Sequence, residues 1–107
     1  MESAANNFIR SNFDVDHIGW DITERSPALL PYVDMLFSGF PCQTFSRAGK
    51  RAGVKCPSGR GVLANHSLAY ARVHLPKAVV YENVMGWMDP EHRSLLYHVE
   101  STMMSIG

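Results

Sequence analysis

Apolar residues recur along the chain at spacings that predict helices and strands in alternation. Three segments have the helical spacing of three to four residues: about 3–11, 61–75 and 89–106. Three shorter segments predict strands: 16–22, 32–40 and 77–84. Residues 26–31, bounded by prolines, predict a helical turn or loop. Asp89 is the expected N-cap of the last helix, with Pro90 at its first position.

This order of elements predicts an α/β fold with a parallel sheet. Buried strands that alternate with amphipathic helices are typical of right-handed βαβ crossovers. In such sheets ligands bind outside the carboxyl ends of the strands. Three features follow predicted strands, namely Asp21, the loop of Pro41, Cys42 and Gln43, and the pair Glu82 and Asn83. We therefore expect all three at one edge of the sheet, which we call the carboxyl edge.

Composition adds a local charge to this picture. The 107 residues suffice for one domain or less, and ten Lys and Arg balance ten Asp and Glu. Five of the basic residues nevertheless fall in one loop without acidic residues: Arg47, Lys50, Arg51, Lys55 and Arg60. Such a loop points to phosphates, although a merely solvated basic loop has the same composition. No apolar run approaches the roughly 20 residues of a membrane span.

The two cysteines raise the question of chemistry. Cys42 and Cys56 make no disulfide framework, and no further Cys or His at zinc-ligand spacing accompanies them, so we expect no metal site. A lone cysteine is commonly a small buried hydrophobe. The position of Cys42 after a strand and before a basic loop favours a reactive thiolate instead, because loop amides and nearby cations stabilise that form.

Glu82 is the second candidate for chemistry. It follows the apolar run AVVY, and a carboxylate at the end of a buried strand is costly unless it is paired or functional. It can cap a helix or hold Arg60 or Arg72. It can also protonate or hydrogen-bond a heterocycle. A thiol and a carboxylate at adjacent strand ends suit attack on an electron-poor ring.

Three stretches resemble the DNA (cytosine-5) methyltransferases: residues 34–53, 59–63 and 76–87. The family's catalytic loop, GFPCQ-x-FS, is matched from Gly39 to Ser46. Its ENV tripeptide is similar to residues 82–84, and its RG-x-L element to residues 60–63. Residues 20–23 (WDIT) resemble the segment that meets the cofactor's adenine, with Trp20 in place of the usual glycine.

The resemblance implies a Rossmann-like S-adenosylmethionine-dependent methyltransferase fold, present in part, with parallel strands and crossover helices. It implies methyl transfer from S-adenosylmethionine to C5 of cytosine in double-stranded DNA, with the target base flipped out of the duplex. Cys42 would add to C6, Glu82 would hold or protonate N3, and Asn83 would position that carboxylate and the loop. The implied cofactor-binding residues are Asp21, Ile22, Pro41 and Leu63. The implied DNA-binding residues are Gln43, Ser46, Arg47, Lys50, Arg51 and Arg60.

The resemblance also implies that residues 1–107 are a central, partial catalytic domain. The family's glycine loop for S-adenosylmethionine would precede Met1, and its QxRxR motif and target recognition region would follow Gly107. The strand at Asp21 would lack its lateral partners in the family's strand order, 3-2-1-4-5. We therefore expect the isolated chain to be inactive, and a second polypeptide to complete it if it is one half of a split enzyme.

Other interpretations stay open at this point. The chain can be a non-catalytic remnant or an α/β binding module. It can also be an RNA-directed member of the family, although those members tend to read PPCQPF, and Gly39, Phe40 and Thr44 argue for DNA. The expected location is the cytoplasm with the nucleoid in a bacterium, or the nucleus in a eukaryote.

Overall fold

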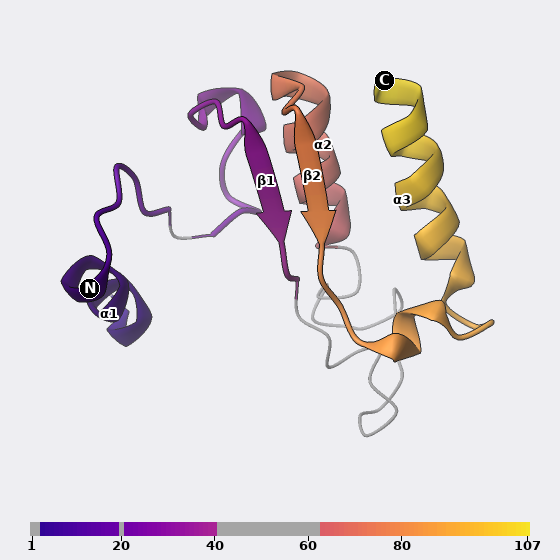
Figure 1. Ribbon diagram of the computed structural model, residues 1–107, viewed down its shortest axis with the longest axis horizontal. Coiled ribbons are helices and arrows are strands. Elements are labelled where there is room, and N and C mark those ends of the chain that lie inside the picture. Colours follow the sequence, from indigo (N-terminus) through magenta and orange to yellow (C-terminus); the bar gives the residue numbers. More distant parts are fainter. Residues whose placement is uncertain (1–2, 20, 41–62) are drawn as a thin grey trace.

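The computed structural model describes residues 3–19, 21–40 and 63–107. Its elements in chain order are α1 (Ala4–Asn12), the 3-10 helix η1 (Pro27–Leu29), β1 (Met35–Ser38), α2 (Ala64–His74), β2 (Ala78–Tyr81), the 3-10 helix η4 (Met85–Met88) and α3 (Arg93–Ile106) (Figure 1). None of the helices in these ranges is long and apolar enough to cross a membrane.

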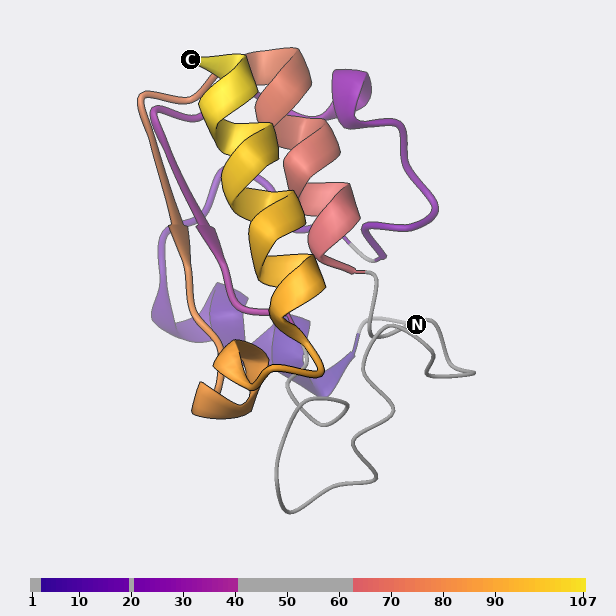
Figure 2. The ribbon, with the colours of Figure 1, turned by 90° about the vertical axis from the view of Figure 1, so that its right-hand side faces the viewer.

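The strands β1 and β2 lie side by side and run parallel, as the sequence predicts. Met35 pairs with Ala78 at one end and Ser38 with Tyr81 at the other. The helices α2 and α3 both cover the same face of this sheet (Figure 2). The structure therefore confirms an α/β arrangement with two parallel strands. This arrangement is compatible with the predicted methyltransferase fold and represents a part of it.

The core lies between the covered sheet face and the two helices. Its buried members are Phe40, Ala64, Leu68, Trp87, Leu95 and Val99. Phe40 follows β1 and Trp87 lies in η4, after β2, so the core reaches the carboxyl edge of the sheet. Phe40, which belongs to the motif from Gly39 to Ser46, and Trp87, which follows the ENV tripeptide, are thus held by packing.

The segment that leads into β1 is attached to α2 by two polar contacts. The hydroxyl of Tyr70 donates to the carbonyl of Pro31 at 2.6 Å, and Nε2 of His74 lies 2.8 Å from the carbonyl of Pro27. The rings of Tyr70 and His74 stack with centroids 4.4 Å apart. These contacts set where the chain enters the sheet.

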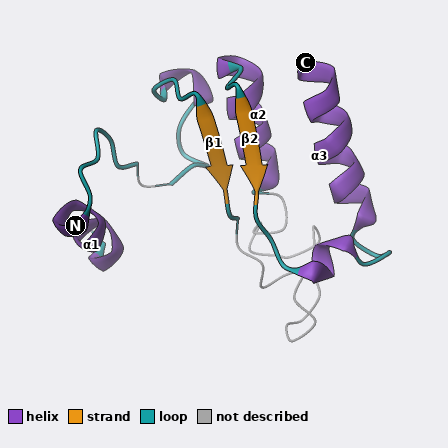
Figure 3. Ribbon diagram, viewed as in Figure 1, coloured by secondary structure: helices purple, strands orange, loops and turns teal. Residues whose placement is uncertain are grey.

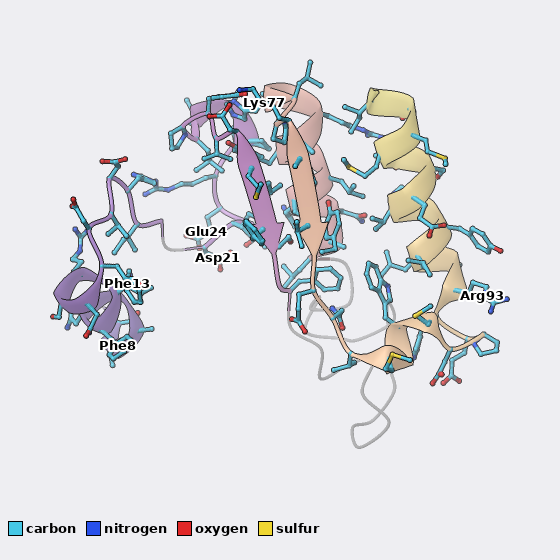
Figure 4. The ribbon with its side chains drawn as sticks, in the orientation of Figure 1. Phe8, Phe13, Asp21, Glu24, Lys77 and Arg93 are labelled. Carbon is cyan, nitrogen blue, oxygen red and sulfur yellow. The ribbon has the colours of Figure 1, made fainter. Side chains whose placement is uncertain are left out.

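The helix α1 confirms the first predicted helix, and it has no buried residue. The side chain of Ser3 caps it by accepting from the amide of Asn6 at 3.2 Å, and none of its residues is buried. It lies apart from the sheet, with Phe8 and Phe13 exposed (Figure 4).

The strand predicted over residues 16–22 is wrong for the part of that segment that the structure describes. Residues 17–19, 21 and 22 have no strand structure, and Asp21 begins a turn instead. Its Oδ1 accepts from the amide of Thr23 at 2.8 Å and from the Thr23 hydroxyl at 2.6 Å. A strand needs a neighbouring strand for its backbone groups, and in the described chain β1 pairs with β2 alone.

The predicted start of the last helix is also wrong. The helix begins at Arg93, not at Pro90, and Asp89 is not its N-cap. Residues 85–88 form η4, whose Trp87 is buried, and the amide of His92 then bonds to the carbonyl of Asp89 at 2.9 Å in a turn. Burial of Trp87 directs the chain into the core first, so the helix starts one turn later.

Candidate active site

Both strands end on the same side of the molecule and continue as loops (Figure 3). The amide of Glu82 bonds to the carbonyl of Ser38 at 3.1 Å, which continues the strand pairing by one residue. Beyond it, Nδ2 of Asn83 donates to the carbonyl of Phe40 at 3.3 Å, and Oδ1 of Asn83 accepts from the amide of Val84 at 2.9 Å. Asn83 therefore ties the end of β2 to the residue that directly precedes Pro41.

Glu82 presents an exposed carboxylate at this edge. Within the described residues it forms no ion pair, so the alternative that it holds Arg72 finds no support. A Cβ built on Gly39 would lie 3.5 Å from Oε2 of Glu82. This is an ordinary van der Waals distance, so the backbone of Gly39 and the carboxylate of Glu82 are neighbours at the carboxyl edge.

Asp21 and Ile22 lie on the other side of β1. Ile22 lines a pocket of about 240 Å³ against the strand, together with Leu30, Phe37, Ser38 and Tyr70. The hydrogen bonds from the side chain and the backbone of Thr23 lower the pKa of Asp21 below its ordinary value, and the charge of His66 acts in the same direction. Since His66 belongs to the first turn of α2, Asp21 faces the beginning of that helix.

Leu63 directly precedes α2 and packs, partly buried, against the core. The described part of the chain has no group of three or more His, Cys, Asp or Glu residues that could hold a metal ion. The remaining predicted site residues lie outside the described residues: Pro41, Cys42, Gln43, Ser46, Arg47, Lys50, Arg51 and Arg60. Their roles stay predictions.

The structure adds aromatic residues that sequence reasoning missed. The ring of Phe40 meets that of Trp87 edge to face at 5.2 Å between centroids, and that of Tyr81 at 6.4 Å. Burial raises the pKa of Tyr81, whose hydroxyl accepts from Ser67 at 3.3 Å. The signal in the sequence was the closeness of these aromatic residues to the two motifs at the strand ends.

Comparison with known proteins identifies the family to which the chain belongs. Residues 1–107 match the family of C-5 cytosine-specific DNA methylases, and the chain belongs to that family. It is 37% identical over 93 residues to the type II methylase M.HgiEI of Herpetosiphon aurantiacus, an alignment that covers 87% of this chain and 20% of that protein.

Two further type II methyltransferases align with almost the whole chain. M.HgiCII of the same organism is 33% identical over 110 residues, covering 100% of this chain and 24% of its own. M.NgoBV of Neisseria gonorrhoeae is 30% identical over 106 residues, covering 99% of this chain and 25% of its own. The chain thus spans a fifth to a quarter of the length of these relatives, and the predicted resemblance to the family is confirmed.

Proposed function

We propose that the methylase to which these residues belong transfers a methyl group to C5 of cytosine in DNA, with Cys42 as its nucleophile. The observation that carries the proposal is the link across the carboxyl edge. Asn83 joins its neighbour Glu82 to Phe40, two residues before Cys42, at 3.3 Å from Nδ2 to the carbonyl oxygen. A carboxylate and a thiol that converge on one pyrimidine ring need such a fixed relation between the two strand ends.

The chemistry follows from what each group does to the ring. The Cys42 thiolate adds to C6 and shifts the electrons of the C5–C6 double bond onto C5, while Glu82 stabilises the charge at N3 by a hydrogen bond or a proton. C5 then bonds to the methyl carbon as the carbon–sulfur bond of the donor breaks. Loss of the C5 proton to a base and expulsion of the thiolate restore the double bond.

S-adenosylmethionine supplies the methyl group on a sulfonium, and the described residues fit its adenine end. The pocket beside β1 offers Ile22 and Phe37 as apolar walls for a flat ring. The Asp21 carboxylate, held in place by Thr23, is an acceptor for an exocyclic amine. Leu63 and Pro41 are the proposed contacts toward the rest of the cofactor.

On the DNA side we assign contacts to the loop that follows Phe40. Gln43 and Ser46 meet the opened duplex, and Arg47, Lys50, Arg51 and Arg60 contact phosphates. The target cytosine must leave the stack to reach both Cys42 and Glu82. The matched family is that of C-5 cytosine-specific DNA methylases, which favours DNA over RNA as substrate. The relatives named above are type II methyltransferases of bacteria, which favours the bacterial cytoplasm as location. If residues 1–107 are one half of a split enzyme, a second polypeptide would supply the remainder of the site.

Trapping of the covalent intermediate tests the proposal. DNA containing 5-fluorocytosine should form a denaturant-stable complex with the complete methylase in the presence of S-adenosylmethionine, because fluorine at C5 prevents proton loss and release. Cys42→Ser should abolish the complex, whereas Cys56→Ser, the matched control, should leave it intact. A complex that survives Cys42→Ser would exclude Cys42 as the nucleophile.

A further inference from the structure

The hydroxyl of Tyr81 links the end of β2 to the helix α2. Tyr81 is the last residue of β2, partly buried against the core, and its hydroxyl lies 3.3 Å from that of Ser67 on α2. Ser67 is 3% exposed, and its hydroxyl also bonds to the carbonyl of Ala64 in the same helix at 2.8 Å. The contact between the two hydroxyls therefore joins sheet and helix at the carboxyl edge.

Core packing alone does not account for these two hydroxyls. Ala64 and Ala71 on α2 are fully buried and fill the space under the sheet without a polar group. A buried hydroxyl costs free energy unless it is hydrogen-bonded. The carbonyl of Ala64 satisfies Ser67 within its own helix. What the Ser67 hydroxyl adds beyond an alanine is therefore the bond to Tyr81.

This bond acts on the residue that directly precedes Glu82. The strand β2 is four residues long, and in the described chain it pairs with β1 alone. The strand pairing holds its end from one side, through the bond from the Glu82 amide to the Ser38 carbonyl at 3.1 Å. Ser67 holds Tyr81 from the helix side, and Asn83 is tied down by its own side chain. Glu82 thus lies between two residues that are each fixed by a side-chain hydrogen bond.

A carboxylate that acts on a ring depends on such fixation, because a misplacement of about 1 Å can cost about 100-fold in rate. We propose that Tyr81 is a positioning residue for Glu82, acting through its hydrogen bond with Ser67. The inference rests on the proposed function, which gives the carboxylate its role. It adds that the strand end carrying Glu82 is fixed to the same helix whose first turn Asp21 faces.

Methyl transfer by the complete methylase, with kcat and KM measured separately, tests the inference. The principal variant is Tyr81→Phe, which keeps the ring that meets Phe40, because Ser67 also lines the pocket beside β1. We expect kcat to fall about fivefold or more, with KM for S-adenosylmethionine and for DNA unchanged, since misplacement of Glu82 affects the transition state and not substrate binding. In a Ser67→Ala background, Tyr81→Phe should cause little further loss, because the bond is already absent.

Two control variants separate this role from a general loss of stability. Ser105→Ala removes a hydroxyl that bonds to the carbonyl three residues earlier on α3, at 2.7 Å, as Ser67 does on α2. Val99→Ala removes buried volume from the core and should lower the melting temperature. Neither control should change kcat at a temperature where the protein stays folded. A fall in kcat that is as large in Val99→Ala as in Tyr81→Phe would overturn the inference.

Glu82→Gln separates the inference from the proposed function. If Tyr81 acts through Glu82, Tyr81→Phe should cause no further loss of kcat in a Glu82→Gln background. A loss there as large as in the unaltered enzyme would overturn the inference. If Glu82→Gln slows methyl transfer and Tyr81→Phe does not, the inference fails and the proposed function stands. Methyl transfer that Glu82→Gln leaves unchanged would reject the role of the carboxylate in the proposed function, and the inference with it.

Discussion

Asp21 and Glu82 are both exposed carboxylates near the carboxyl edge, but their surroundings suit them to different tasks. Thr23 donates two hydrogen bonds to one oxygen of Asp21, which favours its charged form and fixes its direction. Glu82 has no such donors among the described residues, and its carboxylate lies beside Gly39. A fixed acceptor suits binding, whereas an exposed carboxylate without partners among the described residues can accept a hydrogen bond from an incoming base.

The contribution of Glu82 to catalysis is testable by Glu82→Gln. We expect methyl transfer by the complete methylase to fall about 100-fold or more, the usual range for a positioned acid or base. The melting temperature should not change, because the side chain is exposed and unpaired in the described structure. Glu100→Gln, an exposed carboxylate on α3, should leave both quantities unchanged. A Glu82→Gln protein that unfolds would assign the carboxylate a structural role instead.

The hydrogen bonds at Asp21 predict its titration. Its pKa is lowered by the Thr23 hydroxyl first and the Thr23 amide second, so the folded state favours the charged form. This contribution to stability is present above the ordinary pKa range of an aspartate and is lost as the pH falls through the lowered value. In NMR titrations, Thr23→Val should raise the Asp21 pKa, and Thr23→Ser should keep it low. An unchanged pKa in Thr23→Val would show that the hydroxyl is not the cause.

At the scale of elements, the periodicity of apolar residues predicted correctly the helices and strands that depend on nearby residues. It failed for the elements whose formation or start depends on contacts with distant parts of the chain. The helices α1 and α2 and the strands β1 and β2 all lie within their predicted ranges or within one residue of them. Residues 16–22 carry a strand pattern, but a strand forms only beside a partner. The start of α3 at Arg93 depends on burial of Trp87 in η4, which no local pattern reveals.

The candidate site likewise has features that the sequence predicted and features that it did not. The order of strands and motifs predicted that Glu82 and the start of the Cys42 loop would share an edge, and the bond from Asn83 to Phe40 shows that the strand ends meet. The edge-to-face contact of Trp87 with Phe40 could not be predicted, because it depends on side-chain angles between segments 47 positions apart in sequence. The roles of Cys42 and its basic loop stay predictions from the motif.

The attachment of η1 to α2 yields a prediction at this scale. Tyr70→Phe removes the hydroxyl that donates to the Pro31 carbonyl and should lower the free energy of unfolding by about 1 kcal/mol, the usual net value of such a bond. The amides of Leu29 and Leu30 should exchange faster, because the segment from Pro27 to Pro31 loses one of the two hydrogen bonds that join it to α2. Tyr97→Phe, on the exposed face of α3, is the control and should change neither quantity. Equal effects of the two substitutions would contradict the attachment.

At the scale of the whole molecule, helices cover one face of the sheet and leave the other in solvent. Phe37 on β1 and its partner Val80 on β2 are 69% and 41% exposed, and Met35 beside them is 52% exposed. The second edge of β1 has no strand partner among the described residues. Open apolar faces and strand edges favour association with further chain. This surface agrees with a chain that spans about a fifth of its relatives.

The isolated 107 residues should therefore show no measurable methyl transfer. In the proposed function the described residues contact S-adenosylmethionine at its adenine end, through Asp21 and Ile22, and each 1.4 kcal/mol of contact energy that is not formed weakens binding about tenfold. We expect an affinity no tighter than roughly millimolar by calorimetry, and no transfer of tritiated methyl to mixed-sequence DNA. Turnover by the pure chain would contradict this prediction and show that it holds a sufficient site by itself. Turnover that appears when a second methylase polypeptide is added, and disappears with Cys42→Ser, would support the split enzyme and show that the nucleophile comes from this chain.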